Sequence, residues 1–380
     1  MLSRSDLLTD LINAKFDMGI VELFDYCGLG LMHLLNPHSL VVTSSSTLWD
    51  QIAIDIGMPI PPSYVPSSYA IHTDQMTFMQ RLQNILSMAT TVHFFRTMQE
   101  GAQKVFDQRF GSVFPRMEDL TAKASIVLTN SEPLLDFSRP TLDKVINIGG
   151  IGVSEPQKLT EEFDRILSLR KNTVLISFGS MAKSMLMPHT YRESILSAIM
   201  EMPDTTFIWK YENKTDDFAA RVDNVVLSPW IPQNDLLNDI RLTAFVTHGG
   251  MASFQESVAR VSGSLNILNH FKKNWKKYYT LIYHLLTLQW QKDNARRIAQ
   301  MLAKRPFTAR EKLIKNVEFA CEFGEIPQFD PAGRHLNFIQ YYLLDVLFCV
   351  VALLSLIVLF VFVMLKRVFR FYTEKKMKAA

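Results

Sequence analysis

Several side chains between Trp230 and Glu256 have the types and spacing that a nucleotide site needs. Glycines after a strand let the backbone approach a phosphate, and the N–H groups at the start of the next helix bind anions. An indole offers a flat face to a base, an amide both donates and accepts hydrogen bonds, and a carboxylate accepts from ribose hydroxyls. The residues that supply these groups are Trp230, Gln233, His248, Gly249, Gly250, Ser253 and Glu256. The pattern predicts a site for a base, a ribose and a diphosphate.

These residues stand at the ends of predicted strands. Apolar runs at 173–180, 205–212, 224–231 and 242–250 alternate with helical patterns at 189–202 and 232–239. Such alternation is typical of a doubly wound parallel sheet, in which ligands bind outside the carboxyl ends of the strands. Gly179 and Ser180 end the first of these strands, so we expect them at the same edge as the His248 turn.

The first half of the chain predicts a second α/β unit of the same kind. Short apolar runs at 16–24, 40–49, 125–130 and 144–150 predict strands, and the proline-rich run 58–66 predicts a loop. Apolar residues at helical spacing from Met76 to Leu86 predict a long helix over 74–110. The polar segment 154–169 is expected to cross between two domains. The fold class is therefore α/β.

The C-terminus predicts a membrane span. The run Val346 to Leu365 contains no charged residue, and a helix of that length spans about 30 Å, the thickness of the bilayer core. Lys366, Arg367 and Arg370 follow at once, whereas Asp345 precedes the run. The excess of positive charge after the span predicts that residues 366–380 form a cytosolic tail and that the body lies on the luminal side.

Three further patterns bear on location and redox state. Lysines three and five positions from the end, Lys378 and Lys376, resemble a retrieval signal for the endoplasmic reticulum, although a plain basic flank would explain the same lysines. The sequon at Asn213 fits a luminal body. Three cysteines cannot build a disulfide framework, but their number allows a single Cys27–Cys321 bridge.

Composition limits the partners. The formal charge of +3 over 380 residues includes no basic stripe of the kind that nucleic-acid binding needs, so no nucleic-acid partner is expected. No cluster of His, Cys and carboxylates has metal-ligand spacing, so no metal is expected.

The stretch from Ser228 to Glu256 is similar to the signature of the UDP-glucuronosyltransferase and UDP-glycosyltransferase family, in the style of its nematode branch. The segments FDMGIVELFDYCGLG, IPPSYVP, LTNSEPLLDFSRP, NIGGIGV, ISFGSM, FIWKYE and DPAGRHLNFIQYYLLD extend the resemblance. It implies inverting enzymes of the two-domain GT-B fold that move glucuronic acid or glucose from a UDP-sugar co-substrate to a small lipophilic acceptor, without a cofactor. It also implies a single-pass protein of the endoplasmic reticulum membrane.

The resemblance assigns a role to each matching residue. Trp230 would stack on uracil, Gln233 would contact the uridine, and Glu256 would hold the ribose hydroxyls. The diphosphate would lie against the glycine turn, and the side chains around it would be His248, Ser253 and Ser180. Glu22 would orient the catalytic histidine. The implied domains are 1–155 for the acceptor, 156–330 for the donor with an atypical insert at 260–290, and 343–365 for the span.

The chain departs from the family pattern in three places. The histidine that acts as general base belongs to a strand–loop unit that comes before residue 16 in relatives, so we expect either a missing N-terminal unit or a protein without that base. After Glu256 the family motif is replaced by an unrelated insert, as a deletion or an error in the gene model would produce. Ala252 replaces a phosphate-binding asparagine. The alternative function is that of a non-catalytic family member that pairs with complete relatives. Under either function the sequence allows homo-oligomers or hetero-oligomers with family members.

Overall fold

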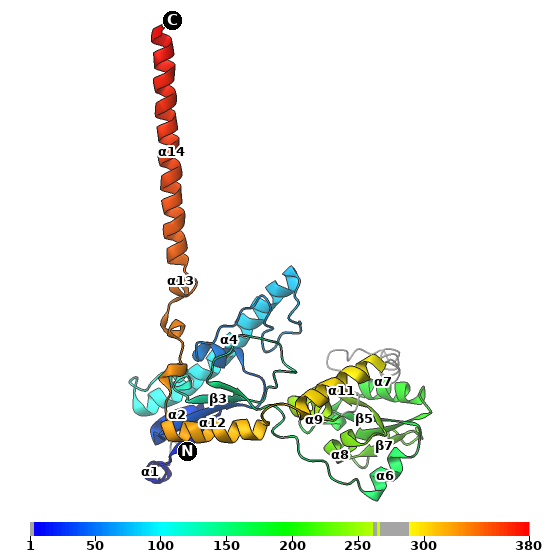
Figure 1. The fold of residues 1–380 in the computed structure, drawn as a ribbon. Coiled ribbons are helices and arrows are strands. Elements are labelled where there is room, and N and C mark those ends of the chain that lie inside the picture. The colour runs from blue at the N-terminus through cyan, green and yellow to red at the C-terminus, as the bar shows by residue number, and fades with distance from the viewer. Residues whose placement is uncertain (1–3, 261–263, 267–288, 380) are drawn as a thin grey trace.

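The computed structural model describes residues 4–260, 264–266 and 289–379. Within these ranges the chain forms two parallel sheets, each with its own helices, and one very long helix that leaves the body (Figure 1). The elements of the first sheet come mainly from the first 150 residues, and those of the second follow them. The two α/β units expected from the sequence, each with its own parallel sheet, are therefore present.

The first sheet has the strand order β1-β2-β3-β4, and all its strands are parallel. Its strands are β1 (Met18–Glu22), β2 (Ser39–Ser44), β3 (Ile126–Thr129) and β4 (Val145–Asn147). The helices that precede and connect them are α1 (Ser5–Asn13), α2 (Cys27–Leu35), α3 (Asp50–Asp55), α4 (Phe78–Phe110) and α5 (Met117–Ala122). A capping box at Thr77 and Gln80 begins α4, and Gly111 with φ of 85° ends it, which confirms the predicted helix.

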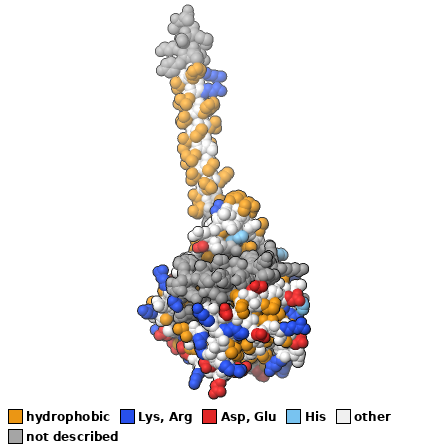
Figure 2. Space-filling model, turned by 90° about the vertical axis from the view of Figure 1, so that its right-hand side faces the viewer, with side chains coloured by type: hydrophobic (Ala, Val, Ile, Leu, Met, Phe, Trp, Pro, Cys, Tyr) orange, Lys and Arg blue, Asp and Glu red, His pale blue; other side chains and the backbone are white. Residues whose placement is uncertain are grey.

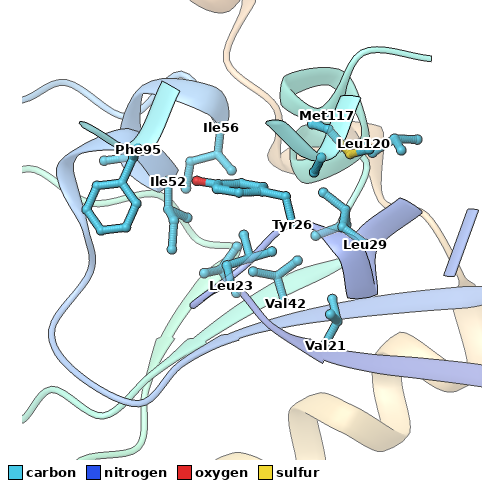
Figure 3. Close-up of a cluster of buried hydrophobic side chains, with 14 of the residues drawn as sticks. Val21, Leu23, Tyr26, Leu29, Val42, Ile52, Ile56, Phe95, Met117 and Leu120 are labelled. Carbon is cyan, nitrogen blue, oxygen red and sulfur yellow. The ribbon is translucent and has the colours of Figure 1, made fainter. Parts of the chain in front are cut away.

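One face of the first sheet is covered by α2, α3, α4 and α5. Figure 3 shows its core, in which Tyr26 lies among aliphatic side chains of the strands and helices. The labelled neighbours include Val21, Val42, Ile52 and Leu120, all buried. Removal of this apolar surface from water provides the main driving force for forming this layer.

The opposite face is covered by α12 (Ala309–Phe323), which comes from the other end of the chain. Leu313, Val317 and Ala320 lie on one side of this helix and pack on Val41 and Ile126 of the sheet. The prediction had placed residues up to 330 with the donor domain. The structure differs because this apolar stripe matches the uncovered face of the first sheet.

The second sheet has the order β7-β6-β5-β8-β9, again all parallel. Its strands are β5 (Asn172–Ser177), β6 (Thr205–Lys210), β7 (Val225–Ser228), β8 (Leu242–Thr247) and β9 (Ser264–Asn266). Its helices are α6 (Glu161–Leu167), α7 (His189–Met200), α8 (Gln233–Asn238), α9 (Met251–Ala259) and α11 (Gln289–Ala303). Strand β9 belongs to the predicted insert, whose other residues lie mostly outside the described ranges.

Two cores lie on the two faces of this sheet. On one face α7 packs on Val174 and Phe207, and on the other α6 and α8 pack on Leu175 and Phe245. The segment 154–169 had been interpreted as a polar crossing, but it contains α6, whose Phe163 and neighbouring apolar residues are buried. The apolar stripe of α6 is short and lies among charged residues, so the sequence pattern did not predict a packed helix here.

After α12 the chain passes through two short turns, η2 (Pro327–Phe329) and η3 (Ala332–His335), to α13 (Phe338–Tyr341) and α14 (Leu344–Ala379). Within the described part of the chain, α14 is the one helix long and apolar enough to cross a bilayer. Figure 2 shows it as a shaft covered by hydrophobic side chains, with Lys and Arg side chains near its far end. Cys27, Cys321 and Cys349 are free thiols, so the Cys27–Cys321 bridge is not formed.

Candidate functional site

The candidate site lies at the carboxyl edge of the second sheet. Strand β5 ends at Ser177 and turns at Gly179, with φ of 81°, while β8 ends at Thr247 and turns at Gly249, with φ of 77°. Both turns use a left-handed backbone conformation that favours glycine. The predicted glycine turns thus lie side by side, because β5 and β8 are neighbours in the sheet.

The imidazole of His248 lies between two glycines. A Cβ at Gly250 would lie 2.5 Å from its Nε2, and a Cβ at Gly179 would lie 2.9 Å from its Cε1. No other residue type fits beside the ring without a shift of the backbone or of the ring. The glycines that follow these two strands therefore serve a second purpose besides turning, since they make room for the histidine.

The protonation state of His248 follows from its surroundings. Burial lowers the pKa of its imidazole below the usual value, because the charged form loses solvation. Its Nδ1 is buried and has no hydrogen-bond partner among the described residues. A neutral imidazole has one donor and one acceptor nitrogen, so the ring can take part in hydrogen bonds of either direction.

Three of the predicted residues form one hydrogen-bonded cluster. The Nε2 of Gln233 donates to Ser253 Oγ at 3.1 Å and to Glu256 Oε2 at 2.6 Å. Gln233 begins α8, and the other two lie on α9, directly after the His248 turn. Ser253 and Glu256 are one turn apart on the helix and face α8 together. Residues far apart in sequence are thus brought to one place.

Trp230 follows β7 at the same edge, and the residue is 74% exposed. Its backbone is held by Ser228, whose Oγ donates to the Trp230 carbonyl at 2.7 Å. The ammonium of Lys210 lies 5.9 Å from the centre of the indole ring and donates to the Gly179 carbonyl at 2.8 Å. An aromatic face that is largely uncovered can accept a stacked base.

Lys210 was not among the predicted site residues, although its position at the end of β6 is a signal that it lies at this edge. Its side chain is mostly buried, with Glu212 3.9 Å away. It links the Trp230 platform to the Gly179 turn, and it brings a positive charge to the edge where phosphates are expected. Ser180 follows Gly179 at the same edge and is exposed.

Glu22 lies elsewhere, at the carboxyl end of β1 in the first sheet. Its Oε2 accepts from Thr43 Oγ1 at 2.8 Å, and its Oε1 accepts from the backbone N–H of Ser45 at 2.9 Å. Both partners belong to the end of β2 and the residue after it. The carboxylate is therefore fixed in direction at the edge of the first sheet.

Gln255 joins the two carboxyl edges, and sequence reasoning did not find it. Its Nε2 donates to the Asn130 carbonyl at 2.8 Å, and its Oε1 accepts from the Gly150 N–H at 3.1 Å. Asn130 and Gly150 lie beyond the ends of β3 and β4, whereas Gln255 lies on α9 next to Glu256. The carboxyl ends of both sheets thus meet at this side chain, which places the candidate site where the two sheets face each other.

Comparison with known proteins identifies the family. Residues 1–263 match the family model described as UDP-glucoronosyl and UDP-glucosyl transferase. The chain belongs to this family. A putative UDP-glucuronosyltransferase of Caenorhabditis elegans is 28% identical over 377 residues, which cover 91% of this chain and 71% of that protein. UDP-glucuronosyltransferase 3A1 of Bos taurus is 33% identical over 68% of this chain and 49% of its own length.

Solved structures show the fold. The glycosyltransferase of kitacinnamycin has a TM-score of 0.53 at 12% identity and covers 84% of this chain and 83% of its own. A UDP-glucosyltransferase from Polygonum tinctorium capable of glucosylating indoxyl has a TM-score of 0.51 at 14% identity, with 85% and 80% covered. The chain has the GT-B glycosyltransferase fold, and the family it belongs to is one of UDP-glycosyltransferases.

Proposed function

We propose that this protein binds a UDP-sugar at the carboxyl edge of the second sheet and transfers the sugar to a small lipophilic acceptor. The observation that supports it most is the cluster of Gln233, Ser253 and Glu256 beside the His248 turn. Trp230 would stack on uracil, Gln233 would contact the uridine, and Glu256 would bind the ribose hydroxyls. The roles of Gln233 and Glu256 use the orientation that their mutual hydrogen bond imposes.

The diphosphate would lie over the two glycine turns. Phosphate oxygens there would meet the N–H groups at the start of α9, the imidazole of His248, the hydroxyls of Ser253 and Ser180, and the ammonium of Lys210. In the transfer, the acceptor oxygen bonds to the anomeric carbon and the bond from that carbon to the phosphate oxygen breaks. The same groups stabilise the charge that the UDP leaving group gains.

The acceptor hydroxyl must also lose its proton to a base. Glu22 would orient that base from the edge of the first sheet, and residues of the first domain would supply an apolar acceptor pocket. In the described part of the chain the hydrogen bonds of Glu22 run to Thr43 and Ser45 rather than to a histidine. This observation favours a second candidate function, UDP-sugar binding without transfer, in a protein that pairs with other family members.

We further propose that α14 anchors the protein in the endoplasmic reticulum membrane as a single span. The body, residues 1–340, would be luminal and the basic tail cytosolic. The supporting observation is the excess of Lys and Arg after the span, together with the exposure of the apolar side chains of α14 over its described length.

Binding of uridine, UMP and UDP to the full chain in detergent tests the nucleotide site. Trp230→Ala is expected to weaken all three ligands by a similar factor, roughly tenfold, because base stacking contributes about 1–3 kcal/mol. His248→Ala is expected to weaken UDP more than uridine. His189→Ala, which removes an exposed histidine of α7, is the matched control. UDP affinity that is unchanged in both site variants would exclude this site.

Release of UDP from UDP-glucose or UDP-glucuronic acid, with a phenol as acceptor, separates the two candidate functions. Turnover above background, lost in Glu22→Ala with UDP affinity retained, supports transfer. UDP binding without turnover, and with no effect of Glu22→Ala, supports the binding-only function.

A further inference from the structure

The apolar stripe of α4 faces away from the protein core. The spacing that predicted this helix includes Met79, Leu82, Ile85 and Leu86, and all four are exposed in the structure. The core contacts of α4 come instead from other positions, among them Phe95 and Phe106. A contiguous exposed stripe of large apolar side chains on a soluble surface marks an interaction site.

The stripe is confined to one end of the helix. Between residues 62 and 95 the chain has only two charged residues, Asp74 and Arg81, and Arg81 donates to the Met76 carbonyl. The rest of α4 has five, Arg96, Glu100, Lys104, Asp107 and Arg109. Further exposed apolar side chains next to the stripe are Tyr69, Ile71 and Phe78, with Phe78 71% exposed. One end of α4 is therefore apolar and nearly free of charge.

The apolar end of α4 lies on the side of the body from which α14 leaves (Figure 1). In Figure 1 the bluer, N-terminal end of α4 rises to about the height of α13, where the long helix begins. The shaft stands upright both in Figure 1 and in Figure 2, which is turned by 90°, so this height is measured along the axis of α14. A bilayer crossed by α14 would have its surface near that level.

The segment before α14 is fixed to the first domain. Arg334 donates to the Asp55 carbonyl at 2.9 Å and to the Asp119 carboxylate at 2.8 Å. Gly57, with φ of 76°, lets Pro331 and Arg334 approach closely, since a Cβ there would lie 2.8 Å from Arg334 Cβ. These contacts join the segment to α3 and α5, on the same face of the sheet as α4. The segment that leads to α14 is thus joined to the first domain on the face that carries α4.

We propose that the exposed apolar end of α4, made of Phe78, Met79, Leu82, Ile85 and Leu86 with Tyr69 and Ile71, lies in the interfacial layer of the bilayer that α14 crosses. The first domain is then held to the membrane at two places. A lipophilic acceptor dissolved in the bilayer would reach this domain without crossing bulk water. The inference rests on the anchor proposed above.

The test measures lipid contact of single labelled positions in the full chain, reconstituted in phosphatidylcholine vesicles. Cys27, Cys321 and Cys349 are first changed to serine, and an environment-sensitive fluorophore is attached at Leu82→Cys. Glu100→Cys, on the charged half of the same helix, is the matched control, and Ser355→Cys inside α14 reports on the anchor. Lipids with a spin label near the headgroup or deep in the chain act as quenchers.

We expect the label at position 82 to be quenched most by the shallow spin label, position 355 most by the deep one, and position 100 by neither. Quenching at 355 but not at 82 would overturn the inference and leave the anchor intact. No quenching at either position would refute the anchor itself. A label at 82 that is shielded from aqueous quencher without lipid quenching would assign the stripe to a second copy or another segment, and would also overturn the inference.

A second variant guards against an accidental effect of the label. Ile85→Glu with Leu86→Glu adds two charges to exposed positions, so the fold is expected to persist. Lipid quenching at position 82 should then be lost while quenching at 355 remains. Retention of quenching at 82 in this variant would contradict the proposed contact.

Discussion

The Gln233 side-chain amide donates a 2.6 Å hydrogen bond to the Glu256 carboxylate and thereby joins the start of α8 to α9. The same nitrogen also donates to Ser253. The carboxylate that is proposed to bind ribose is thus held by the residue proposed to contact the uridine. Loss of either side chain should affect the other, because directly bonded residues are energetically coupled.

We expect Glu256→Ala to lower UDP affinity by about 1.5–3 kcal/mol, or roughly ten- to a hundredfold, the usual value for hydrogen bonds to a charged group. Gln233→Ala should cost less, and the double variant should cost less than the sum of the two. Calorimetric titration with UDP gives all three values, with Glu161→Ala on α6 as a control. Additive effects would show that the two residues bind independently.

Substitution of Gly250 by alanine tests the packing of His248. The new Cβ would lie 2.5 Å from the imidazole Nε2, so the ring must move and UDP affinity should fall. Gly101→Ala is the control, because a Cβ at this position in α4 meets nothing within 4 Å. That change should raise the free energy of unfolding by about 0.5–1 kcal/mol, since alanine restricts the unfolded chain. An unchanged UDP affinity in Gly250→Ala would contradict the role of the turn.

Asp55 predicts a pH dependence of stability. Burial raises the pKa of its carboxyl to about 7, while Gln51 and Gln99 each donate to it at 2.6 Å. The folded state binds this proton more tightly than the unfolded state, whose pKa is about 3.9. The contribution to stability is therefore present below pH 3.9 and is lost as the pH rises to about 7. Melting temperatures between pH 5 and 8 should fall in the native protein and fall less in Asp55→Asn.

The Lys144–Asp330 pair joins the segment before α14 to β4. The Lys144 Nζ lies 2.5 Å from Asp330 Oδ1 and donates to the Ala122 carbonyl at 2.9 Å, and its side chain is only 1% exposed. Asp330→Ala leaves this buried charge without its partner, which should cost about 3 kcal/mol of unfolding free energy. Lys144→Met in the same chain should recover part of the loss. Urea unfolding followed by circular dichroism measures both, and an Asp330→Ala midpoint equal to that of the native protein would contradict the pairing.

Gln255→Ala should loosen the junction of the two domains. The Gly150 N–H loses its acceptor, so hydrogen exchange of the segment 149–153 should become faster. Gln255→Glu keeps that acceptor but loses the donor to the Asn130 carbonyl, and should have a smaller effect at Gly150. UDP affinity should change little in either variant. Exchange at 149–153 that matches the native protein would show that other contacts hold the junction.

The sequence alone determined the parts that depend on local pattern. Strands β1 to β8 and the long helix α4 follow from short apolar runs, glycine turns and caps, because these signals act between near neighbours. The spacing of His248, Ser253 and Glu256 along one turn and one helix likewise predicted that they share an edge with Gln233. The membrane-spanning helix α14 was predicted from the length of its uncharged apolar run alone.

Only the tertiary structure decided which distant residues meet and which surfaces stay uncovered. Helix α12 packs on the first sheet although it follows the second. The side chains of Lys210 and Gln255 bond to residues that no local pattern connects to them. The stripe at Leu82 and Leu86 has the spacing of a core face, yet it is exposed because other residues of α4 fill the core. Periodicity predicts that a helix is amphipathic, whereas the packing of the whole chain determines what its apolar face contacts.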